Sequence, residues 1–155
     1  MVKKKRKKKA RRTDTKVYQA KLFRKQANKA MKLWLAAVRK VGKNQCFICG
    51  IKQGEKVNGK PVRLNCHHIE DRNNWALRFD IYNGVLLCPT HHKFGIDSAH
   101  KAPVWFLTKL SNRIVEYLIA IRTELPQRRA GWTIGRLDAV IERLERINNA
   151  GAIKD

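Results

Sequence analysis

The sequence predicts an α+β fold, and three observations lead to that class. Residues 13–41 contain neither Pro nor Gly and are rich in Ala, Lys, Gln and Arg, which favours helix. Residues 43–101 are interrupted by Gly and hold every Cys and His of the chain around two strand-like runs. Residues 102–155 carry two apolar stripes at helical spacing. We expect one domain, with a mixed central segment between an N-terminal helix and two C-terminal helices.

The charge of the chain restricts its partners. The net charge is +23, from 35 Lys and Arg against 12 Asp and Glu. So large an imbalance opposes compaction unless a polyanion is bound, and nucleic acid is the commonest polyanion partner. No apolar run in the sequence approaches the roughly 20 residues of a membrane span, so we expect no membrane partner.

The start of the chain and its cysteines predict where it works. The basic start is not followed by an apolar stretch, so it does not have the pattern of a secretory signal. We expect an intracellular protein that is not secreted, in a reducing compartment. The four cysteines then serve as metal ligands or buried thiols rather than as disulfides.

The N-terminal part is expected to divide into a tail and a helix. Residues 1–12 hold nine cations in their last ten positions. Like charges at this density do not pack, so we expect a disordered basic tail that either neutralises phosphates or only aids solubility. Residues 13–42 predict a basic helix that Gly42 ends. Lys25 and Lys29 lie on its basic face, where phosphates can reach them.

Two strands and a short helix are expected in the centre. Lys60 to Ile69 and Gly84 to Cys88 have strand-like composition, the second as a buried run. Gly50 to Gly59 is expected to form a loop. Pro89 to Phe94 begins a helix, since Pro suits a first helical turn.

Residues 102–155 predict a helical hairpin. Pro103 to Thr123 and Thr133 to Asn148 each show an apolar stripe, with a turn at Pro126 to Gly131 between them. The stripes serve either as scaffold within the chain or as the seam of a homodimer through the C-terminal helices.

Two short-spaced pairs predict a structural zinc site. Cys46 and Cys49 form a C-x2-C pair, and Cys88 and His91 form a C-x2-H pair after 38 intervening residues. Zn²⁺ prefers four tetrahedral sulfur and nitrogen ligands, and such a site contributes folding free energy directly. The alternative is two unrelated pairs of buried residues. Cys66 can replace His91 as fourth ligand, but it stands alone on a strand, and we interpret it as a buried thiol.

A second group of residues carries a resemblance. His67 and His68 end the first predicted strand, Asn83 precedes the second strand, and His92 follows it. With the C-x2-C pair, the stretch "LNCHHIEDRNNWALRFDIYNGVLLCPTHHKF" and the later "SAH" resemble the zinc-containing HNH endonucleases common in bacteriophages. The resemblance covers residues 46–100 and not the flanking helices. It implies a ββα-metal core, in which two strands and a helix bind one catalytic divalent ion. If the chain is phage-encoded, the resemblance also implies that the protein is located in the host cytoplasm.

The resemblance also implies a role for each matching residue. His68 matches the general base, and Asn83 matches the residue that fixes the loop holding that base. His67 and His92 match ligands of the catalytic ion, and His100 is a further ligand or a phosphate contact. Weaker alternatives are Asp71 and Asp97.

The chemistry of these residues supports phosphodiester cleavage independently of the resemblance. Histidine titrates at about pH 6 to 7, so a neutral His can accept a proton from water. A divalent cation neutralises charge at the phosphate and the leaving oxygen. His67, His92 and His100 give three ligands, which leaves positions open for water or substrate. Nitrogen ligands favour Zn²⁺, Ni²⁺ or Mn²⁺ over Mg²⁺ in affinity, and all four ions stay open as candidates. The alternative is that these histidines are extra zinc ligands or packed in the core.

Basic residues around this site are expected to hold double-stranded DNA through its phosphates. They are Arg63, Arg72, Arg78, Lys93 and Lys101. Trp75 and Phe79 either stack on a base or pack in the core. The competing function is a non-catalytic zinc module that binds DNA or RNA. That module explains the charge and the Cys pairs but not the order His68, Asn83, His92.

Overall fold

The computed structural model describes residues 2–150, with side chains from Thr15 onward. Helix α1 (Val2–Val41) begins earlier than the sequence predicted, because the backbone of residues 2–12 continues the helix instead of forming a separate tail. Lys, Arg and Ala are good helix formers, and neither Pro nor Gly interrupts them. The helix ends where predicted, since the Gly42 N–H donates to the Val38 carbonyl at 2.9 Å.

The central sheet has two antiparallel strands. Strand β3 (Asn65–His68) pairs with β4 (Gly84–Leu87), so that His67 lies opposite Val85 and His68 opposite Gly84. The second predicted strand is confirmed. The first is shorter than predicted, because the chain leaves the sheet before Asn65 and the Leu64 N–H donates to the side chain of Gln53 at 2.7 Å.

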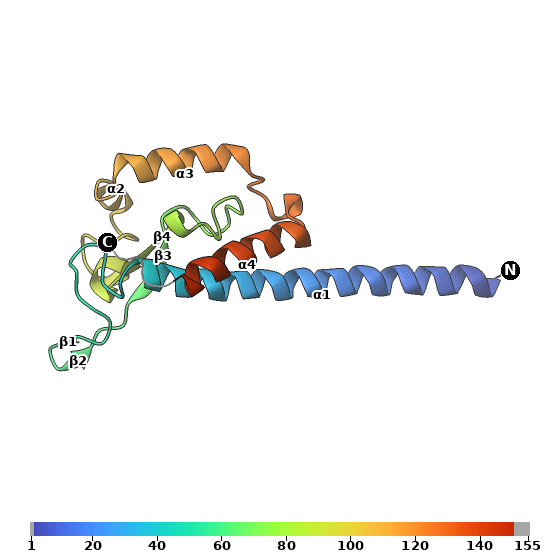
Figure 1. Cartoon of the computed structure of the whole chain (residues 1–155), viewed down its shortest axis with the longest axis horizontal. Coiled ribbons are helices and arrows are strands. Elements are labelled where there is room, and N and C mark those ends of the chain that lie inside the picture. The colour runs from blue at the N-terminus through green and yellow to red at the C-terminus, as the bar shows by residue number, and fades with distance from the viewer. Residues whose placement is uncertain (1, 151–155) are drawn as a thin grey trace.

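A second hairpin lies where a loop was predicted. Strands β1 (Lys56–Val57) and β2 (Lys60–Pro61) pair across a tight turn. Asn58 and Gly59 occupy that turn with φ of 49° and 74°, the left-handed conformation that a two-residue hairpin turn requires. The hairpin projects away from the rest of the molecule (Figure 1).

The segment after β4 is a single wide turn rather than a regular helix. Turn η2 (Thr90–Phe94) is closed by a hydrogen bond from the Gly95 N–H to the Thr90 carbonyl at 2.8 Å. Residues 95–100 then fold back over it, with the Ala99 N–H donating to the His91 carbonyl at 2.8 Å. The return places His100 beside the turn.

The C-terminal helices differ from the predicted hairpin. The long helix predicted from Pro103 is broken into α2 (Pro103–Leu107) and α3 (Asn112–Glu124), because Ser111 caps a new helix by accepting from the Ile114 N–H. Helix α4 (Ile134–Asn149) lies along α1 (Figure 1), and the Asn148 side chain donates to the Leu33 carbonyl at 3.0 Å.

The apolar stripes of α3 and α4 are therefore used within the chain. Leu118 of α3 packs against Ala76 and Leu77, and Leu137 and Leu144 of α4 join the main core. This confirms the scaffold role, while a homodimer through the same helices stays a prediction.

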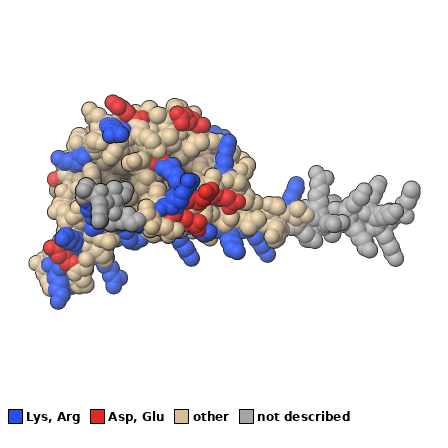
Figure 2. Space-filling model, in the orientation of Figure 1, with Lys and Arg blue, Asp and Glu red and all other residues tan. Residues whose placement is uncertain are grey.

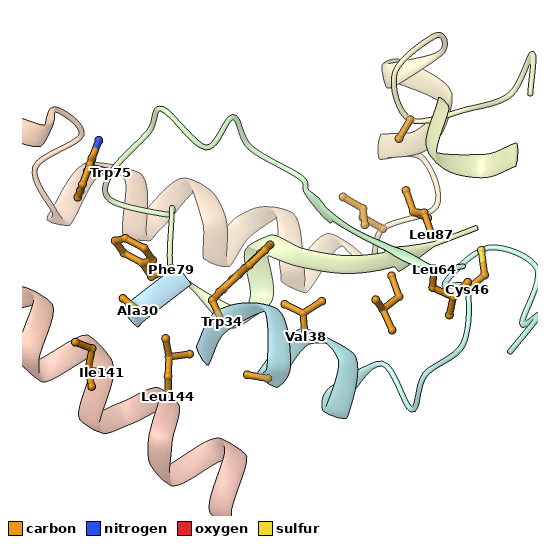
Figure 3. Close-up of a cluster of buried hydrophobic side chains, with 14 of the residues drawn as sticks. Ala30, Trp34, Val38, Cys46, Leu64, Trp75, Phe79, Leu87, Ile141 and Leu144 are labelled. Atoms are coloured by element: carbon orange, nitrogen blue, oxygen red, sulfur yellow. The ribbon is translucent and has the colours of Figure 1, made fainter. Parts of the chain in front are cut away.

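The core joins α1, β4 and α4 (Figure 3). Trp34 and Val38 of α1 approach β4 so closely that a Cβ on Gly84 would lie 2.7 Å from the Trp34 ring. Trp75 and Phe79 are buried in the same core, which confirms packing rather than base stacking. The fold is thus α+β. Within residues 2–150, no helix combines the length and the apolar composition needed to cross a bilayer.

Candidate metal centres and catalytic residues

The predicted Cys/His pairs converge into a cluster that can bind a metal ion. The ligand atoms of Cys46, Cys49, Cys88 and His91 all lie within 4.8 Å of one another. Cys49 Sγ is 3.9 Å from Cys88 Sγ, and His91 Nδ1 is 3.2 Å from Cys88 Sγ and 3.7 Å from Cys46 Sγ. Sulfur and nitrogen ligands on one tetrahedral ion lie about 3.4 to 3.8 Å apart. The donor set and spacing therefore fit a closed four-ligand site, which we call the sulfur-rich cluster.

Backbone hydrogen bonds form the turn that carries the first pair. The Gly50 N–H donates to the Cys46 carbonyl at 2.8 Å, and Gly50 has a φ of 72° that allows the chain to reverse. The Phe47 N–H donates to the Leu86 carbonyl of β4 at 2.8 Å. The first Cys pair is thus attached to the strand that leads to the second.

Burial affects the thiols of this cluster unequally. Burial raises the pKa of Cys49 to about 11, and the neighbouring Cys46 adds to the effect. For Cys46 burial also raises the pKa, but hydrogen bonds from backbone N–H groups outweigh it and leave the pKa lowered. Three thiolates so close together repel one another unless a cation lies between them.

His91, not Cys66, is the fourth member of the cluster. Cys66 is half-buried, and its thiol donates to the Leu35 carbonyl at 3.7 Å. Burial raises the pKa of Cys66. The sequence predicted a buried thiol; Cys66 lies outside the cluster but is only half-buried.

The second predicted ligand set also converges. His67, His92 and His100 place their ligand nitrogens within 4.8 Å of one another, and Nε2 of His92 is 3.3 Å from Nε2 of His100. Two nitrogens bound at about 2.1 Å to one tetrahedral ion lie about 3.4 Å apart. We call this group the imidazole cluster. Asp71 and Asp97, the weaker alternatives, belong to neither cluster of the described residues.

The imidazole cluster favours neutral rings. Burial, followed by the charges of His92 and His100, lowers the pKa of His67 to about 4. Burial and the neighbouring His100 and Lys93 lower the pKa of His92. Neutral imidazoles present lone pairs, which is the form that binds a cation.

His68 lies next to this cluster in sequence but faces another element. Its ring stacks on Trp34 of α1, with centroids 4.0 Å apart and planes 7° from parallel, whereas the His67 ring meets Phe106. Successive strand residues point to opposite faces, which accounts for the difference. Among the described residues no ring contact joins His68 to the imidazole cluster.

The hydrogen bond of His68 defines its tautomer. Nε2 of His68 lies 2.9 Å from the Arg78 carbonyl. A carbonyl only accepts, so Nε2 carries the proton and Nδ1 of the neutral ring keeps its lone pair. Burial lowers the pKa of His68, and the bond to Arg78 partly opposes this.

Asn83 fixes the loop that carries the Arg78 carbonyl. It is fully buried, and its amide accepts from the Glu70 N–H at 2.7 Å. The same amide donates to the Glu70 carbonyl at 3.2 Å and to the Leu77 carbonyl at 3.0 Å. Both ends of the loop are thereby held beside His68.

The predicted phosphate contacts are spread over several elements, and all are exposed except Arg78, which is half-buried. Arg63 and Arg72 lie on loops, and Lys93 and Lys101 flank the imidazole cluster. Lys101 donates to the Phe94 carbonyl at 3.1 Å. Figure 2 shows basic side chains projecting from α1 away from α4. A shallow groove on the surface of α1 is lined by Lys21, Arg24, Lys25, Asn28, Lys29 and Lys32.

One of these contacts already has a partner. Lys29 forms an ion pair with Glu145 at 2.8 Å, so it is less available to a phosphate than Lys25.

Two contributions to the site were not predicted. Trp34 stacks on the His68 ring, and the backbone carbonyl of Arg78 accepts a hydrogen bond from Nε2 of His68. In the sequence Trp34 was visible only as an apolar residue at helical spacing. A backbone carbonyl is present at every residue, so the sequence does not show which one His68 contacts.

Comparisons of the chain with models of protein families, with curated protein sequences and with solved structures give no match. Its function is therefore argued from the site itself.

Proposed function

We propose that this protein is a metal-dependent endonuclease of the HNH type that hydrolyses DNA phosphodiester bonds. The observation that carries the proposal is the convergence of His67, His92 and His100 into an open set of three nitrogen ligands. A site with three ligands and free positions is typical of catalytic metal centres, whereas the sulfur-rich cluster has the four ligands of a structural zinc.

The local architecture supports the same proposal. Two antiparallel strands, β3 and β4, are followed by the helical turn η2, and the histidines come from β3, η2 and the segment returning over it. That order is the one expected of a ββα-metal core. The net charge of +23 and the basic groove of α1 supply attraction for the DNA backbone.

The residues divide the chemistry between them. Bound at the imidazole cluster, a divalent cation supplies charge neutralisation at the scissile phosphate and the leaving oxygen. His68 ends β3 with its ring on the other face from His67, so in this proposal it would accept a proton through Nδ1 from a water at the strand end. The water oxygen bonds to phosphorus as the bond to the 3′-oxygen breaks, and the leaving 3′-alkoxide takes a proton from solvent. The products are a 5′-phosphate and a 3′-hydroxyl. Asn83 is a positioning residue, since it holds the loop that orients His68.

The proposal is tested by plasmid cleavage in the presence of Mn²⁺, Ni²⁺, Mg²⁺ or Zn²⁺. We expect His68→Ala to lower the cleavage rate by about 10²- to 10⁴-fold, the usual contribution of a general base. The variant should keep its DNA affinity, because the basic residues are unchanged, and the metal of the sulfur-rich cluster, because His68 is not one of its ligands.

Two outcomes would contradict the proposal. Equal cutting by wild type and His68→Ala removes His68 as base. Tight DNA binding by wild type without cutting in any of the four ions supports a non-catalytic zinc module instead.

A further inference from the structure

Two arginines, Arg72 and Arg78, lie near His68, and a third, Arg129, lies near Arg78. Arg72 and Arg78 belong to the loop after β3, and Arg129 begins η3 (Arg129–Gly131), the turn before α4. The Arg78 side chain donates to the Arg72 carbonyl at 2.8 Å. In the part of the chain with described side chains, no ion pair involves any of the three guanidiniums.

Aromatic rings hold two of these guanidiniums in place. The guanidinium carbon of Arg78 is 4.9 Å from the centre of the Trp75 ring, and that of Arg129 is 5.0 Å from the centre of the Phe23 ring. Phe23 and Trp75 are themselves in contact, with centroids 5.7 Å apart. Stacking fixes the plane of a guanidinium while leaving N–H donors at its edge.

The positive charge of the arginine cluster is offset only in part, by the nearby Asp71, which forms no ion pair with it among the described side chains. Arg78 is half-buried, and its Nε has no hydrogen-bond partner although the atom is buried. Burial and the charges of Arg72 and Arg129 lower the pKa of Arg78, and the charge of Asp71 opposes this only in part. Crowded like charges and an unmet buried donor both cost free energy, and an anion at the cluster would relieve the repulsion.

The cluster is tied directly to the proposed base. The carbonyl of Arg78 is the group that accepts the hydrogen bond from His68 Nε2. Because the backbone of Arg78 contacts the His68 ring, an anion bound by the Arg78 side chain would lie no farther from that ring than the length of one arginine side chain. Guanidinium groups bind phosphate through paired N–H donors, which fits a nucleic-acid backbone better than a single point charge would.

We propose that Arg72, Arg78 and Arg129 form a binding site for a backbone phosphate of the DNA strand and so position that strand against His68. The inference rests on the proposed function, because it takes His68 as the base. It joins Arg72 and Arg78, which the sequence predicted as separate phosphate contacts, into one site and adds Arg129, which is far from both in sequence.

The experiment measures duplex DNA binding by fluorescence anisotropy over a range of salt, together with cleavage kinetics. We expect Arg129→Gln and Arg78→Gln each to raise Kd by about tenfold or more, as the loss of a charged hydrogen bond predicts. Each should lower the slope of log Kd against log salt by about one. Arg78→Lys should restore the slope but not the full affinity, because Lys lacks the paired donors.

Arg146→Gln is the matched control. Arg146 is an exposed arginine of α4 that pairs with Glu142 at 3.8 Å, so the variant removes the same charge elsewhere. We expect its Kd and salt slope to stay those of wild type. A fall in affinity equal to that of Arg129→Gln would attribute the effect to net charge and overturn the inference.

The remaining outcomes separate this inference from the proposed function. If wild type cuts DNA while Arg129→Gln and Arg78→Gln bind with unchanged Kd and slope, the phosphate site is wrong and the nuclease stands. If wild type binds but never cuts, the nuclease is wrong, and the arginine variants still decide whether the cluster binds phosphate. Arg129 is exposed, so its variant keeps the test valid even if Arg78→Gln does not fold.

Discussion

The sulfur-rich cluster and the imidazole cluster share one turn but differ in how they are closed. His91 and His92 are neighbours on η2, yet each belongs to a different cluster. Cys46 and Cys88 are buried in the first cluster, while His100 of the second is exposed. Four ligands, two of them buried cysteines, suit a structural ion, and three nitrogens with an exposed edge suit exchange with substrate. The turn η2 thus supplies one ligand to the closed four-residue cluster and one to the open three-residue cluster.

Breaking the sulfur-rich cluster should have the largest effect. Cys49→Ala removes one of four ligands, and we expect loss of the bound metal and of cooperative folding. A structural zinc contributes on the order of 10 kcal/mol, which is comparable to the whole stability of a domain. Metal content per chain and thermal melting by circular dichroism check this. Cys66→Ala is the control, since Cys66 lies outside the cluster; loss of metal from both variants would refute the ligand assignment.

An intermediate effect is expected from the hydrogen bonds that hold the loop beside His68. Asn83→Ala leaves the Glu70 N–H and the Glu70 and Leu77 carbonyls without this partner, which should cost about 3 kcal/mol. Urea denaturation measures the loss, and the metal of the sulfur-rich cluster should stay bound. Asn73→Ala, an exposed position in the same loop, should change stability little. Similar losses in both variants would mean that Asn83 does not hold the loop.

The smallest effect on stability should come from the imidazole cluster. His100→Ala alters an exposed residue, so we expect the free energy of unfolding to change by less than about 0.5 kcal/mol. The affinity for a second divalent ion should nevertheless fall by at least about tenfold, as calorimetric titration with Mn²⁺ or Ni²⁺ would show. Asp97→Ala is the matched exposed control and should leave that affinity unchanged. An unaltered second site in His100→Ala would remove His100 from the ligand set.

Local chemistry was the part of the molecule that the sequence predicted well. The two Cys/His pairs and the strand from Gly84 were identified because ligand spacing and apolar runs act over a few residues. The hairpin at Asn58 and Gly59 was missed although that dipeptide favours such a turn. The helix break before Ser111 has no Gly or Pro to announce it, so only the cap reveals it.

Contacts between distant segments were not predictable in this way. The stack of His68 on Trp34 joins residues from β3 and α1, and the arginine cluster brings Arg129 to a loop more than 40 residues earlier. The packing of α4 along α1 rather than against α3 is likewise a choice among apolar faces of similar composition. Each depends on which surfaces meet, and periodicity alone does not rank those pairings.

If α1 lies along the proposed DNA partner, the length of this helix sets the stretch of duplex that it contacts. A helix of 40 residues extends about 60 Å at a rise of about 1.5 Å per residue. Duplex DNA advances about 3.4 Å per base pair, so this rod matches about 18 base pairs. In a footprinting experiment, the DNA protected by α1 would therefore end within two turns of the duplex from the point where α1 joins the rest of the protein.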